Sequence, residues 1–188
     1  LDAPSNALHL EIDTLDGEVV NTGAITAGAV NGVAVLLEIG NGATFTNTGG
    51  GLIIGDVVFG WDAAYHFIAE DGGIDGDLIG EGGEGNDDTI TVQNGTHTFT
   101  GGTASNFALF VVADGGTAMM GALFEGDTAS SGYAFSNVDN LAVNGGGTLY
   151  IGQSTTLVVD NNFTQQAGGT LEFYLGAPGG ADFGDLTG

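Results

Sequence analysis

The sequence predicts an all-β protein, a right-handed parallel β-helix (β-solenoid) of roughly seven or eight coils, and three observations support that prediction. The chain of 188 residues contains 37 glycines and two prolines, a composition that suits tight corners and disfavours helices. Short runs of alternating or β-branched residues recur along its length. Units made of a strand, a polar residue, a glycine-rich corner and a second strand recur at the spacing of one solenoid coil.

The expected strands are short and are separated by Gly, Asn or Asp. The first of them, ALHLEI, alternates apolar and polar residues, so that one of its faces can be buried. The later strands are rich in Thr, Val, Ile and aromatic residues, which fit a pleated and half-buried surface. The clearest expected strands are residues 7–12, 43–47, 89–92, 96–100, 148–152, 155–159 and 170–176.

A repeating unit joins these strands into one expected domain over residues 1–188. Asn21 and Asn47 are 26 positions apart and Gly152 and Gly176 are 24 apart, which is the length of one coil with three short strands. An antiparallel β-sandwich is the alternative, because it also has a strand about every 8 to 12 residues. The repeated stretches are residues 19–28, 44–55, 141–152 and 163–176.

Asparagines recur at the corners of these units. In stacked coils, side-chain amides at equivalent positions can bond to one another along the axis. We therefore expect asparagine ladders, with Asn21, Asn47, Asn144 and Asn161 as their members.

The charged residues are all of one sign. The chain has no Lys and no Arg but 24 Asp and Glu, a formal charge of -24. Nucleic acids and anionic membrane surfaces are bound mainly through Lys and Arg, so neither is an expected partner. The apolar runs 33–39 and 106–113 are far shorter than the ~20 residues of a membrane-spanning helix, and no membrane insertion is expected.

The sequence offers little catalytic chemistry. It has no cysteine, and no serine lies in a GxSxG elbow. Pectate-lyase-like and polygalacturonase-like enzymes resemble the expected architecture, but they use Arg or Lys on acidic sugars. His9, His66 and His97 lie in strand-like sequence, where a packed or surface histidine is expected. We therefore expect no enzyme and no catalytic residue.

An acidic, glycine-rich segment at residues 71–88 is the candidate site. Its stretches GGIDGDLI and GGEGNDDTI, within residues 72–90, resemble the GGxGxDxUx repeats of RTX-type calcium solenoids. The resemblance implies Ca²⁺ in a loop or corner, with Asp75, Asp77, Asp87 and Asp88 as ligands. A solvated acidic loop is the alternative. The carboxylates of the segment belong to Asp71, Asp75, Asp77, Glu81, Glu84, Asp87 and Asp88.

A second resemblance concerns residues 155–188. The stretch TTLVVDNNFTQQAGGTLEFYLG (155–176), followed by DFGDLTG (182–188), resembles the C-terminal part of autotransporter passenger domains. In that family a strand, an Asn-aromatic-polar-Gln step, a Gly-Gly corner and an apolar strand form the last coils of a right-handed parallel β-helix. The resemblance implies a secreted protein, extracellular or at the cell surface.

The expected end coils suggest a function. ALHLEI begins a strand almost at once, and the final stretch 177–188 is too glycine-rich for a covering helix. Open solenoid ends add further strands, so we expect head-to-tail self-association into a filament, as an extracellular structural protein. A calcium-dependent adhesin or polysaccharide-binding module is the alternative. Its candidate sugar-stacking residues are Trp61, Tyr65 and Phe67, which equally fit a core segment.

Overall fold

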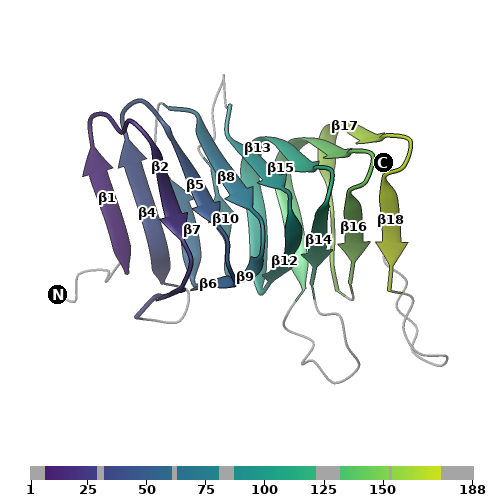
Figure 1. Ribbon diagram of the computed structural model, residues 1–188, viewed down its shortest axis with the longest axis horizontal. Helices are drawn as coiled ribbons and strands as arrows, with labels where there is room; N and C mark the ends of the chain where they lie inside the picture. Colours follow the sequence, from purple (N-terminus) through teal and green to yellow (C-terminus); the bar gives the residue numbers. More distant parts are fainter. Residues whose placement is uncertain are drawn as a thin grey trace.

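The chain folds as a parallel β-solenoid. The computed structural model describes residues 7–28, 32–60, 63–80, 87–121, 132–152 and 154–174. In these ranges every regular element is a strand and every strand pairing is parallel. The prediction of a β-solenoid is confirmed, and the antiparallel sandwich is excluded. Figure 1 shows the coils stacked along the long axis, from β1 at one end to β18 at the other.

The strands form two sheets. The larger sheet has eleven strands: β1 (Leu8–Ile12), β2 (Glu18–Asn21), β4 (Val33–Ile39), β5 (Ala43–Asn47), β7 (Asp56–Phe59), β8 (Tyr65–Ala69), β10 (Leu78–Ile79), β11 (Thr89–Val92), β13 (Gly102–Val112), β15 (Tyr133–Val143) and β17 (Val159–Gln165). The smaller sheet has seven strands: β3 (Ala24–Thr26), β6 (Gly51–Ile54), β9 (Gly72–Asp75), β12 (Gly95–Thr100), β14 (Gly116–Met120), β16 (Thr148–Ile151) and β18 (Thr170–Phe173).

The larger sheet changes its form along the axis. In the first four coils it consists of two separate ladders, β1-β4-β7-β10 and β2-β5-β8-β11. The eleven-residue strand β13 pairs with β10 near its start and with β11 near its end, and thereby joins the two ladders. Asn106 bends β13 between them with a φ of 62°, in the left-handed region that asparagine tolerates better than most residues. Asn137 does the same in β15.

The solenoid has about six turns, fewer than the seven or eight predicted. The coils differ in length because corner segments differ in length. Equivalent residues are 22 positions apart between Asn140 and Asn162 but 31 apart between Asn106 and Asn137. Predicted strand 155–159 also differs, since Thr156 forms only an isolated bridge and the strand β17 begins at Val159.

The core lies inside the coils and consists of apolar side chains stacked from coil to coil. Parallel in-register pairing places the same position of successive coils directly above one another, so aromatic residues meet in columns. The rings of the register partners Phe45 and Phe67 have centroids 5.7 Å apart, and Phe135 packs against Phe110 from a different column with centroids 4.9 Å apart. Nothing in the described part of the chain is a helix long and apolar enough to cross a membrane.

Candidate functional site

The four predicted calcium ligands lie at two places along the chain, on either side of β10. Asp75 ends β9 with an exposed side chain, and Asp77 lies just before β10. The Asp77 carboxylate accepts a hydrogen bond from the Thr103 backbone N–H at 2.7 Å, while its own N–H donates to Asp56 at 3.0 Å. This first pair of predicted ligands therefore lies at the corner where β13 begins.

Asp88 has a separate and buried position. Its side-chain Oδ1 accepts the Tyr65 backbone N–H at 2.8 Å, and its carbonyl accepts the Ala108 N–H. Only 1% of Asp88 is exposed, whereas the neighbouring Asp87 is exposed. Thr103 and Ala108 lie on opposite sides of the Asn106 corner, and within the described residues no three of the four aspartates bring their ligand atoms within 4.8 Å of one another. Glu81 and Glu84 of the same segment lie outside the described residues.

Asp88 is expected to stabilise the fold through its backbone contact, with or without calcium. Asp88→Ala removes the Oδ1 atom that accepts the hydrogen bond of the buried Tyr65 N–H, and should lower the free energy of unfolding by about 1 to 3 kcal/mol. Asp88→Asn keeps a side-chain oxygen and should lose less. Urea unfolding in chelator measures both, with Asp87→Ala as the exposed control that stays within about 0.5 kcal/mol of the parent. An Asp88→Ala protein as stable as the parent would contradict the structural role.

Carboxylates elsewhere are also satisfied by neutral donors on adjacent coils. Glu70 accepts hydrogen bonds from Asn94 at 3.1 Å, Thr48 at 2.8 Å and Gln93 at 3.2 Å, and these bonds lower the pKa of Glu70. Glu18 accepts a bond from Thr46 at 3.1 Å. A chain without Lys or Arg thus uses hydroxyl, amide and backbone groups to hold part of its negative charge in place.

Asparagine ladders are present, but only one is the ladder predicted. Asn21 donates to Asn47 at 2.7 Å inside the first two coils, as expected. Asn137 donates to Asn106 at 3.1 Å and Asn162 donates to Asn140 at 3.0 Å. These two further ladders were not predicted. For the ladder of Asn106 and Asn137, the available signal was the Ser-Asn-apolar triplet shared by residues 105–107 and 136–138.

One mixed cluster in the described part of the chain has a geometry that can hold a metal. The ligand atoms of His9, Glu11 and Glu38 lie within 4.8 Å of one another on β1 and β4, and His9 Nε2 is 2.7 Å from Glu38. Imidazole and carboxylate together suit a first-row transition ion better than Ca²⁺. The cluster lies at the rim of an open hollow that Glu11, Asp13 and Glu38 help to line.

The other singled-out aromatic and histidine residues have structural positions. Tyr65 and Phe67 are buried, with the Tyr65 hydroxyl bonded to the backbone of Ile39, so neither can stack on a sugar. Trp61 lies outside the described residues. His66 is exposed and bonded to Thr89, whereas His97 is fully buried.

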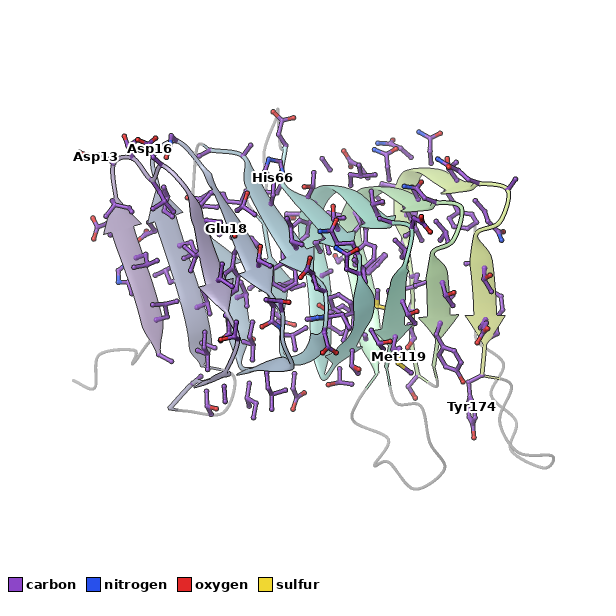
Figure 2. All side chains as sticks on the ribbon, viewed as in Figure 1. Asp13, Asp16, Glu18, His66, Met119 and Tyr174 are labelled. Carbon is purple, nitrogen blue, oxygen red and sulfur yellow. The ribbon has the colours of Figure 1, made fainter. Side chains whose placement is uncertain are left out.

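The last coil of the solenoid exposes large apolar side chains beside its core. In the last coil, Phe163 is 50% exposed and Phe173 is 38% exposed. They border an open hollow of about 460 Å³ that is lined mainly by apolar side chains of the last two coils, including Leu141, Leu149 and Leu171. At the other end, Val20 of the first coil is 48% exposed on the outward face of β2. Figure 2 places Asp13, Asp16 and Glu18 at this end and Tyr174 at the other.

Comparison of the chain with protein-family models, with curated proteins and with solved structures found no match.

Proposed function

We propose that this protein is an extracellular structural subunit that stacks end to end on copies of itself to form a filament. The observation that carries the proposal is the open core of the last coil, where Phe163 and Phe173 border a hollow. Large apolar side chains exposed together at one end mark an interaction surface. β17 and β18 also have no further strand beyond them in the described chain, which leaves backbone groups free to pair.

The first coil has complementary properties. β2 and β3 are the outermost strands of their ladders at that end. One copy can therefore add its first coil to the last coil of another by strand addition. Such a contact joins two different surfaces and does not close on itself, so it propagates along the axis.

The proposal also includes the location of the protein and the role of cations in its assembly. The resemblance of residues 155–176 to autotransporter passengers, and a chain without trypsin cleavage sites, favour a place outside the cell or on its surface. The charge of -24 opposes stacking when it is not screened. Calcium and other divalent cations therefore act here as promoters of assembly, and no single four-aspartate site is required.

Filament growth is expected to depend on screening and on the apolar end. Light scattering and negative-stain microscopy of the full chain should show mainly single subunits in low salt, and filaments in millimolar Ca²⁺ or in about 0.5 M NaCl, where the Debye length falls to about 4 Å. Phe163→Glu should weaken association at least tenfold, because each junction would bury an uncompensated charge.

Leu52→Glu is the matched control, because Leu52 is comparably exposed, at 42%, but lies on the outer side of β6. It should assemble like the parent. Single subunits under all salt, calcium and protein concentrations would refute the filament.

A further inference from the structure

The two ends of the solenoid carry matching residues at equivalent positions of the coil. One inward-facing position recurs once per coil in the larger sheet, from β2 to β17, and the strand registers identify the residue that occupies it in each coil. It is occupied by Asn21, Asn47, Ala69, Val92, Val112, Val143 and Gln165. Amide side chains thus occupy this position in the first two coils and in the last coil, and small or β-branched apolar residues occupy it between them.

Two apolar columns show the same agreement between the ends. The first runs through Val19, Phe45, Phe67, Ile90, Phe110, Leu141 and Phe163. The second, in the smaller sheet, runs through Ile25, Ile53, Ile74, Phe99, Met120, Ile151 and Phe173. A copy placed one coil beyond the last would therefore set Val19 on Phe163 and Ile25 on Phe173, as apolar contacts.

The same placement keeps the carboxylates of Glu18 and Glu172 away from other carboxylates of the paired strands. Glu18 belongs to the column that ends at Asn162. Glu172 belongs to the column that begins at Ala24. Each of these acidic residues would thus meet an uncharged residue across the junction, which matters for a chain that has no cationic side chain to neutralise a carboxylate pair.

The amides have the hydrogen-bonding capacity to continue the ladder across a junction. Gln165 donates one Nε2 hydrogen to Gly169 O at 2.7 Å, as Asn47 donates to Gly51 O at 2.9 Å. Its second hydrogen is directed to no other group of the described chain. Asn21 Oδ1 accepts the Gly23 N–H at 3.1 Å, and a carbonyl oxygen can accept a second bond. A bond from Gln165 to Asn21 would run in the same direction as the bond from Asn21 to Asn47.

We infer that copies of this chain stack in one register, with the last coil of one copy receiving the first coil of the next so that Gln165 meets Asn21. The inference rests on the proposed function, and it names the register of that contact. A slip of one residue would turn every inward side chain outward. A slip of two residues would bury an amide against an apolar residue. A buried amide without a hydrogen-bond partner destabilises the junction, and this loss selects the inferred register.

Disulfide trapping tests this register, because the chain has no cysteine of its own. Glu18 and Asn162 point outward, and the inferred register places them on adjacent strands about 4.8 Å apart, within the range for a disulfide. The double variant Glu18→Cys with Asn162→Cys, oxidised under filament-forming conditions, should give a ladder of covalent multimers on a non-reducing gel, with at least tenfold more product than the control.

The control is Val20→Cys with Asn162→Cys. Val20 also points outward on β2, but two residues further along, which separates the Cα atoms by about 8 Å, too far for a disulfide. The register would be wrong if filaments form but the control pair is cross-linked and the Glu18 pair is not. It would also be wrong if filaments form and neither pair is cross-linked, and in both cases the proposed filament would remain supported. Light scattering that detects no assembly of either double variant, or of the unmodified protein, would overturn both the register and the proposed function.

Discussion

Acidification from pH 7 to pH 5 is expected to destabilise the fold by about 2 kcal/mol through His97 alone. His97 lies in the core between Phe67 and Phe99, with ring centroids 5.9 and 4.8 Å away. Neither ring nitrogen has a hydrogen-bond partner in the described chain. Burial lowers the pKa of His97 to about 3. The imidazole is therefore neutral in the folded protein at every pH near neutrality.

The sign of the effect follows from the two pKa values. The unfolded chain has the ordinary histidine pKa of about 6.5 and binds the proton first as the pH falls. Stability is complete above about pH 6.5, decreases towards pH 3, and the full loss approaches about 5 kcal/mol. Relief of carboxylate repulsion acts in the opposite direction on the whole protein, so a comparison of variants is needed to isolate His97.

His97→Leu removes the titrating group and should flatten the pH dependence between pH 7 and pH 5 by that same amount. Urea unfolding of dilute protein at pH 7, 6 and 5, above the isoelectric point of 4.1, gives the slopes. His66→Gln, which changes an exposed histidine, is the matched control. Equal slopes for His97→Leu and the parent would show that this imidazole is not held neutral by the core.

The fold was predictable because parallel stacking repeats the same chemistry once per coil. The spacing of 26 residues between Asn21 and Asn47 is the real length of the first coil, and their amides are bonded. The number of turns was less predictable. Equivalent residues are only 20 positions apart between Val92 and Val112 but 31 apart between Thr117 and Thr148, so the two spacings that showed the repeat did not fix the length of every coil.

Two features could not be predicted from sequence spacing, namely the corners at the asparagines and the positions of the aspartates in the acidic segment. Asn106 lies within what reads as one apolar strand, and only its left-handed backbone reveals the corner. Asp77 and Asp88 are close in the sequence, but Asp77 precedes β10, which pairs with the start of β13, whereas Asp88 precedes β11, which pairs with its end, and spacing alone does not reveal this.

Replacing Gly72 with alanine is expected to lower the free energy of unfolding by more than about 4 kcal/mol. Gly72 begins β9 with a φ of 135°, a backbone region that is essentially restricted to glycine. A Cβ at this position would collide with the carbonyl oxygen of Gly51 on the preceding coil. The collision is with backbone and not with a flexible side chain, so the two coils would have to separate, and the ladder of the smaller sheet would weaken with them.

Gly50→Ala separates backbone strain from collision. Gly50 also has a positive φ, of 79°, but an added Cβ would meet nothing within 4 Å. Gly50→Ala should therefore lower the free energy of unfolding only by the strain of a left-handed residue, about 1 to 2 kcal/mol. Urea unfolding and thermal melting of the two variants should therefore differ by several kcal/mol, with Gly72→Ala the less stable. Equal losses would show that the coils can move apart at Gly51 without cost, and that the close approach of backbone at this corner does not hold the stack together.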